Sequence, residues 1–194
     1  FEGACFTDAV WAFVTERQAA AGESRSYRVV VVPRASHTPD KVVDALNAYI
    51  NAGGTVLAVG DCFTRDEYGR PRNKSLEETG TGRLVRYPGP LTAHAYRDIL
   101  NALLDATGCR RPIRLTGAYE EPVWGVYSRT AEQGGRLLLS LVNFTREPKR
   151  IRLQSELEQG QTMNLLTGQP VHFPLELSPL DPALLQIETS PVTP

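Results

Sequence analysis

The stretch that decides the fold is YRVVVVPRASHTPDKVVDALNAYINAGGTVLAVG, residues 27–60. Its first run, YRVVVV, is rich in β-branched residues and lacks polar alternation, which is typical of a strand buried on both faces of a parallel sheet. Thr38 is expected to cap a helix whose first residue is Pro39. Gly53-Gly54 ends that helix, and TVLAVG is a second buried strand. The stretch therefore predicts a strand–helix–strand unit with parallel strands and a right-handed crossover.

The same pattern extends in both directions from this unit. Residues 4–20 are predicted to form a helix, because Phe6, Val10, Phe13 and Val14 recur close to helical spacing. A polar loop from residue 61 to residue 82 precedes a short strand, GRLVRY, and a helix over residues 93–108. Alternating helices and strands predict an α/β domain with a parallel sheet over residues 1–112.

After residue 112 the helical period disappears. Short apolar stretches follow one another, separated by glycine-containing turns: WGVYSRT, RLLLSLVNF, RIRLQ, TMNLLTG, VHFPLEL and ALLQIE. Strands and turns that recur about every ten residues predict a small antiparallel β-sandwich, here over residues 118–188. Its best hairpin joins residues 124–130 to residues 136–144 across AEQGG. Residues 189–194 are predicted to be a disordered tail.

Composition excludes several classes of function. The chain of 194 residues has a formal net charge of -1, 41% hydrophobic and 22% charged residues, so nothing predicts binding to nucleic acid or to a membrane. Three widely spaced cysteines make neither a disulfide framework nor a zinc site, which favours a reducing, cytoplasmic location. We expect no cofactor, because no phosphate-binding or dinucleotide-binding glycine motif is present. Met163 is the only methionine, so Phe1 is not expected to be the native start.

Several segments resemble family 42-type β-galactosidases and related glycoside hydrolases. Three segments are similar to the Rossmann-like, class I glutamine-amidotransferase-like domain of these enzymes, which is often called the trimerisation domain. They are YRVVVVP, LNAYINAGGTVLAVGD and the loop DEYGRP. LLLSLVNFT, NLLTG and LELSPLDPALLQI resemble the small C-terminal β-sandwich of the same enzymes. The similarity covers the chain from about Val29 to Ile187. It implies that the α/β domain is Rossmann-like, with a flavodoxin- or amidotransferase-like parallel sheet.

This resemblance implies an accessory function in carbohydrate metabolism. In such enzymes a (β/α)8 barrel with two glutamates performs the hydrolysis, and a barrel needs about 250 residues, which this chain does not contain. The chain is therefore expected to be non-catalytic by itself and to support a homo-oligomer and a catalytic barrel domain of a larger parent protein. The resemblance also implies that at least one strand of the Rossmann-like domain is missing, so we expect that domain to be truncated at its N-terminus.

A second hypothesis is a Cys-dependent, amidotransferase-like hydrolase that uses Cys62 and His37. Cys62 follows a buried strand, as a nucleophile does in such enzymes, and His37 follows the preceding strand. Against this, Asp61 precedes the cysteine and a polar loop follows it, where a nucleophile elbow needs a helix N-terminus. The alternative is a small structural cysteine at a strand end.

Other side chains are candidates for binding rather than catalysis. His37, Asp61, Arg65 and Asp66 follow the carboxyl ends of two neighbouring strands, where parallel sheets bind ligands, so they are predicted to form a substrate rim or a subunit interface. A third hypothesis is a carbohydrate-binding module in which Trp124 stacks on a sugar; the alternative is core packing. The adjacent carboxylates 66–67 and 120–121 point to opposite sides of an extended chain and do not form a glycosidase pair.

Overall fold

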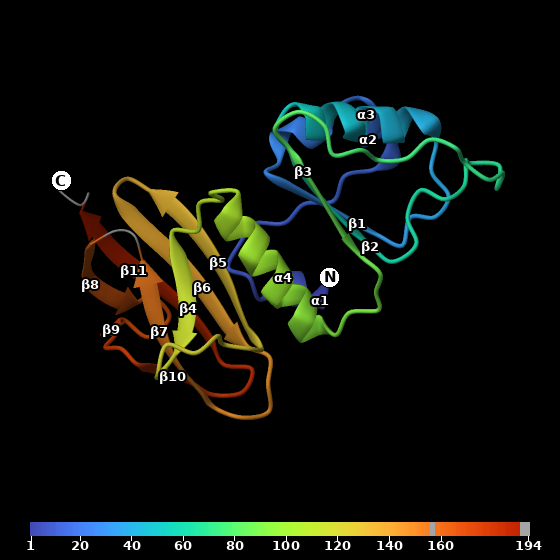
Figure 1. Cartoon of the computed structure of the whole chain (residues 1–194). Coiled ribbons are helices and arrows are strands. Elements are labelled where there is room, and N and C mark those ends of the chain that lie inside the picture. The colour runs from blue at the N-terminus through green and yellow to red at the C-terminus, as the bar shows by residue number, and fades with distance from the viewer. Residues whose placement is uncertain (156–157, 191–194) are drawn as a thin grey trace. The chain divides into compact units, whose positions relative to one another are not determined.

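The computed structural model describes residues 1–155 and 158–190, which fall into two compact units (Figure 1). The Rossmann-like unit contains Ala12–Thr92 and Asn101–Cys109, and the sandwich unit contains Phe1–Trp11, Ala93–Leu100 and Arg110–Pro194. A parallel sheet in one unit and antiparallel sheets in the other confirm the predicted fold class. Helix α4 (Ala93–Ala106) contributes residues to both units, and the predicted domain limits at residues 112 and 118 stay a prediction.

The Rossmann-like unit is built around three parallel strands in the order β1-β2-β3. These are β1 (Val29–Pro33), β2 (Thr55–Val59) and β3 (Arg83–Tyr87), with Val29 beside Thr55 and Thr55 beside Arg83. All five residues of the middle strand β2 are buried, as its continuous apolar run predicted. Helix α3 (Asp40–Asn51) packs its apolar face on this sheet, in a core that includes Val43, Leu46, Ile50, Val56 and Ala58.

Side-chain hydrogen bonds and one close ring contact hold the segments at the two ends of α3. The predicted capping role of Thr38 was wrong: Pro39 occupies the N-cap position, and the Thr38 hydroxyl instead donates to the carbonyl oxygen of Ala35 at 3.2 Å. At the other end, the Tyr49 hydroxyl donates to the carbonyl oxygens of Tyr27 and Arg28, each at 3.0 Å. The Tyr49 ring lies where a Cβ on Gly54 would be, 2.2 Å from the nearest ring carbon.

The predicted helix over residues 4–20 was wrong. The structure has two short helices, α1 (Glu2–Cys5) and α2 (Glu16–Ala20), followed by the 3-10 turn η1 (Glu23–Ser26). Asp8 adopts a left-handed φ of 55°, which a continuous helix does not allow. Val10 and Phe13 are 74% and 83% exposed, so the apolar spacing does not mark a buried stripe. Thr15 begins α2 with a capping box closed by Gln18.

The sandwich unit contains two antiparallel sheets. One has the strand order β10-β7-β4, and the other has the order β5-β6-β11-β8-β9. The bounds of these strands are β4 (Ile113–Gly117), β5 (Val126–Gln133), β6 (Arg136–Asn143), β7 (Lys149–Ser155), β8 (Glu158–Asn164), β9 (Gln169–Pro170), β10 (Leu175–Leu177) and β11 (Pro182–Ser190). Of the predicted tail, residues 189–190 end β11, and residues 191–194 lie outside the described residues.

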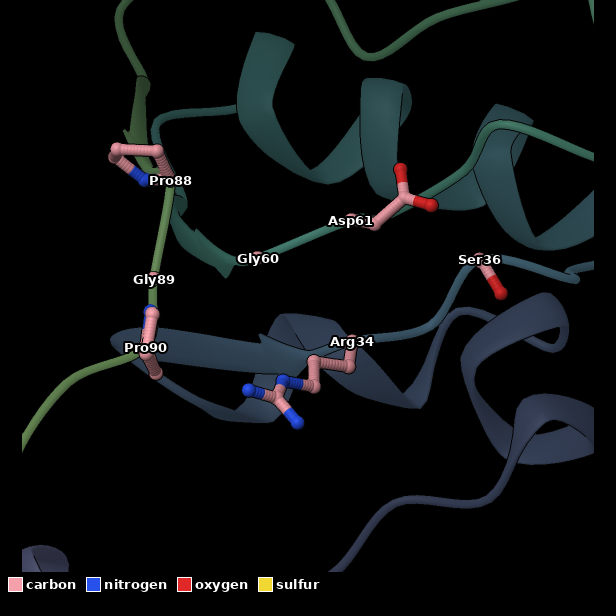
Figure 2. Close-up of a pocket in the computed structure, with 7 residues that line it drawn as sticks. All are labelled: Arg34, Ser36, Gly60, Asp61, Pro88, Gly89 and Pro90. Atoms are coloured by element: carbon pink, nitrogen blue, oxygen red, sulfur yellow. The ribbon is translucent and has the colours of Figure 1, made fainter.

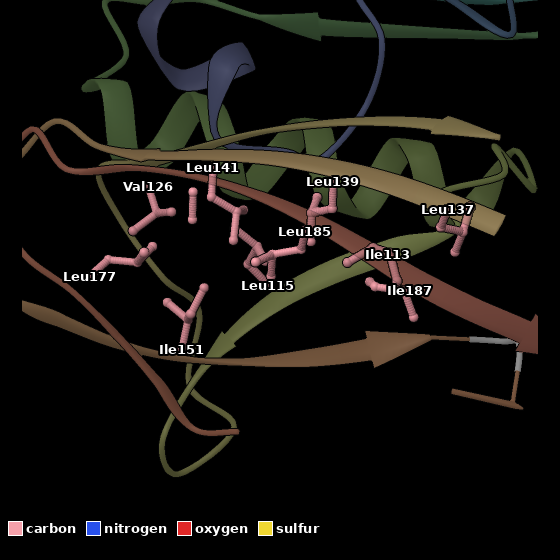
Figure 3. Close-up of a cluster of buried hydrophobic side chains, with 11 residues drawn as sticks. Ile113, Leu115, Val126, Leu137, Leu139, Leu141, Ile151, Leu177, Leu185 and Ile187 are labelled. Atoms are coloured by element: carbon pink, nitrogen blue, oxygen red, sulfur yellow. The ribbon is translucent and has the colours of Figure 1, made fainter. Parts of the chain in front are cut away.

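The predicted hairpin is formed by β5 and β6. It closes more tightly than expected, because Gln133 pairs with Arg136 and only Gly134-Gly135 make the turn. Both glycines have positive φ, 57° and 75°, as the favoured two-residue hairpin turn requires. Figure 3 shows the core between the two sheets. It is a cluster of buried aliphatic side chains: Ile113, Leu115, Val126, Leu137, Leu139, Leu141, Ile151, Leu177, Ala183, Leu185 and Ile187.

Candidate functional site

The segments that follow β1 and β2 run side by side at the carboxyl edge of the parallel sheet. The N–H of Phe63 donates to the carbonyl oxygen of Ala35 at 2.7 Å, and the N–H of Arg65 donates to that of Ser36 at 2.9 Å. His37 and Arg65 form an isolated parallel bridge. Sequence reasoning placed His37, Asp61, Arg65 and Asp66 at this edge, and the structure brings the two segments that carry them together. Their role as a substrate rim or interface stays a prediction.

Arg65 and Asp66 have well-defined local partners. The Arg65 guanidinium donates to the carbonyl oxygen of Gly69 at 2.8 Å, and Asp66 Oδ1 accepts the N–H groups of Tyr68 and Arg70 at 2.9 and 2.8 Å. Desolvation opposes ionisation of Asp66, but the two N–H groups and the positive charges of Arg70 and Arg72 outweigh it and lower its pKa. Both side chains therefore order the DEYGR turn.

Beside these segments lies a pocket of about 320 Å³ (Figure 2). The residues that line it come directly after the three strands. Arg34 and Ser36 follow β1, Gly60 and Asp61 follow β2, and Pro88, Gly89 and Pro90 follow β3. Figure 2 shows the Arg34 guanidinium directed toward Pro90 and the Asp61 carboxylate directed away from Arg34. Arg34 and Asp61 are both exposed, and among the residues that the structure describes neither has an ion-pair partner.

Sequence reasoning identified Asp61 but missed the other residues of this pocket. Arg34 follows the proline that closes β1, which is a signal for a strand end but not for a binding side chain. Sequence reasoning also missed Arg72, whose side chain is 2% exposed. Arg72 forms an ion pair with Asp40 and donates to the carbonyl oxygens of Thr38 and Arg65, so it ties the loop after β2 to the start of α3.

Cys62 has the contacts of a structural cysteine. Its Sγ donates to the carbonyl oxygens of Val32 and Val59, at 3.3 and 3.4 Å, and the side chain packs against the core of the Rossmann-like unit. No helix follows it: residues 61–72 are irregular, and Phe63 adopts a left-handed φ of 61°. The His37 Nδ1 lies 3.0 Å from the Ser36 hydroxyl. These contacts favour the structural alternative, and a catalytic role for Cys62 and His37 stays untested.

Trp124 belongs to an aromatic cluster in the sandwich unit. Its ring stacks on His94 with centroids 3.8 Å apart and meets the Phe6 ring at 4.7 Å in an edge-to-face arrangement. The Arg97 guanidinium lies 5.4 Å from the Trp124 ring centroid. Trp124 precedes β5 and is half-buried. The cluster favours packing over sugar stacking, and sugar binding at Trp124 stays a prediction.

Within residues 1–155 and 158–190, no group of three or more His, Cys, Asp or Glu side chains is arranged to hold a metal ion. None of the helices in the same ranges has the length and apolar character needed to cross a membrane.

Solved structures share this architecture. A GH42 exo-carrageenase from Bacteroides ovatus matches 97% of the chain with a TM-score of 0.76 and 19% sequence identity. Gan42B, a GH42 β-galactosidase from G. stearothermophilus studied as a catalytic mutant, matches 97% with a TM-score of 0.75 and 11% identity. A β-galactosidase from Bacillus circulans sp. alkalophilus matches 83% with a TM-score of 0.59 and 11% identity.

The chain has the fold of one part of these enzymes. It spans 26% of the exo-carrageenase chain, 35% of the Gan42B chain and 33% of the Bacillus circulans chain. The resemblance found in the sequence is thereby confirmed at the level of the fold. No protein-family model matches the chain, and no curated protein matches it.

Proposed function

We propose that this chain is a non-catalytic accessory region of a β-galactosidase-like glycoside hydrolase. The observation that carries the proposal is the match of both units together, over 97% of the chain, to about a quarter to a third of GH42 enzymes. One unit alone is a common architecture, but a Rossmann-like unit joined to a small sandwich in this order is a more specific combination. The catalytic barrel would lie in a parent protein or in a partner chain.

The chemistry of the chain supports an accessory role. The thiol that sequence reasoning considered as a nucleophile donates to two carbonyl oxygens, and no helix N-terminus follows it to hold an oxyanion. One oxygen of the Asp66 carboxylate, Oδ1, accepts two backbone N–H groups of its own turn. A glycosidase needs two carboxyl groups that face each other across a sugar, and these side chains do not provide them.

We further propose that the Rossmann-like unit supports a homo-oligomer and borders the active site of the parent enzyme, in the cytoplasm. The carboxyl edge of its sheet carries exposed His37, Asp61 and Arg65. Polar, charged loops of this kind are typical of an interface rim rather than of its buried centre.

The first experiment measures the mass of the native protein in its source cells with an antibody to this chain. A band larger than 21.4 kDa by at least a barrel of about 250 residues would support the proposal. A band near 21.4 kDa would require a separate barrel-bearing partner in immunoprecipitates, and its absence there would overturn the proposal. Light scattering on the native protein then tests the oligomer.

A second experiment tests catalysis by the chain itself. The 194-residue protein is incubated with a panel of aryl glycosides, and we expect no hydrolysis above the buffer rate. The intact parent protein serves as the positive control. Turnover by the isolated chain that survives repurification would contradict the accessory role.

A further inference from the structure

The pocket at the carboxyl edge of the parallel sheet has the position and size of a ligand site. Its volume of about 320 Å³ falls within the range of small-molecule pockets, roughly 300–1,000 Å³. In open parallel sheets, ligands bind outside the carboxyl ends of the strands. Here residues that follow all three strands line one open pocket, so the fold places it where such ligands bind.

The backbone at this pocket departs from ordinary strand geometry at each strand end. Arg34, Gly60 and Gly89 all have left-handed φ values, 49°, 73° and 63°. Glycine adopts this conformation freely, but arginine does not, and such strain in a non-glycine residue is found preferentially at functional sites. A Cβ at Gly60 would lie 3.0 Å from Arg34 Cγ, so glycine at position 60 leaves room for the arginine side chain.

Some of the hydrogen-bond donors at the pocket are paired and some are not: the N–H groups of Arg34, Ser36 and Gly60 donate to carbonyl oxygens, whereas three other donors have no protein acceptor in the described residues. In the described part of the chain the Arg34 guanidinium makes no hydrogen bond or ion pair, although Asp61 lines the same pocket. The backbone N–H groups of Asp61 and Gly89 likewise donate to no oxygen of the described residues. A guanidinium and unpaired backbone N–H groups are the donors with which proteins bind carboxylate and phosphate groups.

We propose that this pocket binds the oxyanion of a small molecule, a carboxylate or a phosphate, with the Arg34 guanidinium as its main partner. The Pro88 and Pro90 rings flank the bound group, and Ser36 lies at the opposite side of the pocket (Figure 2). The Asp61 carboxylate lines the same pocket and weakens binding of an anion through its like charge. The site is independent of the accessory function proposed above.

The test is a titration of the 194-residue protein followed by 1H–15N correlation spectra. The probes are inorganic phosphate for a tetrahedral oxyanion, galacturonate for a carboxylate on a sugar, and galactose for the neutral sugar, at constant ionic strength set with sodium chloride. We expect the amide resonances of Asp61 and Gly89 to shift saturably with phosphate or galacturonate and not with galactose. The oxyanion that saturates identifies the source of the ligand. Equal shifts with galactose, or no saturable shift with any probe, would overturn the proposal.

Substitutions separate binding from folding. Arg34→Gly removes the guanidinium and relieves the left-handed strain, so affinity is expected to fall at least about tenfold while the Tm of the unliganded protein is not lowered. Asp61→Asn is expected to tighten binding by about two- to fivefold because it removes a like charge. Arg17→Ala, which removes an exposed arginine of α2 outside the pocket, is the matched control and should bind as the original chain does. Undiminished binding by Arg34→Gly would refute the assignment.

Discussion

Asp8 offers a stringent test of how the N-terminal segment is held in the sandwich unit. Its Oδ2 accepts the N–H of Leu115 in β4 at 2.9 Å, and its Oδ1 accepts the hydroxyl of Ser128 in β5. The neighbouring Thr7 carbonyl oxygen accepts a hydrogen bond from Arg111 at 3.1 Å. Asp8 thus connects residues 1–11 to one strand of each sheet, and substituting it should loosen that connection.

Two substitutions at this position have different expected costs. Asp8→Ala leaves the Leu115 N–H without its acceptor, removes the bond to Ser128 and places alanine at a φ of 55°. A stranded, partly buried N–H costs about 2 kcal/mol, so the free energy of unfolding should fall by about 3 kcal/mol in total. Asp8→Asn keeps an acceptor for Leu115 and a donor for Ser128, and asparagine tolerates the left-handed region.

The pH dependence of the free energy of unfolding separates the effect of the Asp8 charge from the effect of its side-chain shape. Burial raises the pKa of Asp8, although the hydrogen bonds from Ser128 and Leu115 and the charges of Arg111 and Arg114 oppose it. Because the folded state then binds the proton more tightly than the unfolded state, the contribution of Asp8 to stability is present at acid pH. It is lost as pH rises from the ordinary carboxyl value of 3.8 through the raised pKa. Asp8→Asn does not titrate and lacks this loss. The free energy of unfolding of Asp8→Asn, relative to that of the original chain, should therefore increase from pH 4 toward pH 7.

Urea unfolding monitored by tryptophan fluorescence measures these effects. The two tryptophans of the chain, Trp11 and Trp124, both belong to the sandwich unit, so the signal reports the unit that Asp8 ties together. Curves for the three proteins are compared at several pH values between 4 and 8. An Asp8→Ala midpoint equal to that of the original chain, or an Asp8→Asn advantage that shrinks as pH rises, would refute the reasoning.

Three further predictions concern packing and reactivity. Gly54→Ala should lower the free energy of unfolding by about 3 kcal/mol in a urea titration followed by circular dichroism, because its Cβ would overlap the buried Tyr49 ring; Gly22→Ala, where φ is 85° and no atom lies within 4 Å, should cost only about 1 kcal/mol. Cys62 should react with a thiol reagent no faster than an unactivated thiol across pH 6–9, and fast, low-pH labelling would favour the hydrolase alternative. Trp124→Ala should cost about 3 kcal/mol, measured by calorimetry, and fluorescence of the original chain that responds saturably to an oligosaccharide would favour the sugar-binding alternative.

The sequence predicted the elements whose local pattern and tertiary setting agree. The YRVVVV run became β1, and TVLAV became the fully buried β2, because a central parallel strand has no solvent face to demand alternation. Gly134-Gly135 marked a hairpin turn correctly, although the pattern placed the strand ends three residues too far apart. The strand-end rule also predicted that residues after β1 and β2 would lie together, as His37 and Arg65 do.

Sequence reasoning failed where a single residue is controlled by contacts remote in the chain. The spacing of Phe6, Val10 and Phe13 is helical, but Asp8 interrupts it because its carboxyl group is bound by residues more than 100 positions away. The conformation of Arg34 is equally invisible in the sequence, since nothing in the local pattern predicts a left-handed arginine. The pocket could not be predicted from the sequence because its lining comes from three segments that meet only in the folded sheet.

The turn after β2 explains why the Cys62 thiol faces the core rather than the sheet edge. A nucleophile elbow presents its thiol outward and continues into a helix whose N–H groups face the substrate. Here Gly60 and Phe63, on either side of Cys62, both take left-handed φ values, and the buried Phe63 packs into the core. The thiol accordingly turns inward to the carbonyl oxygens of β1 and β2. At the pocket beside this turn, the Arg34 guanidinium is the group that we propose binds an anion.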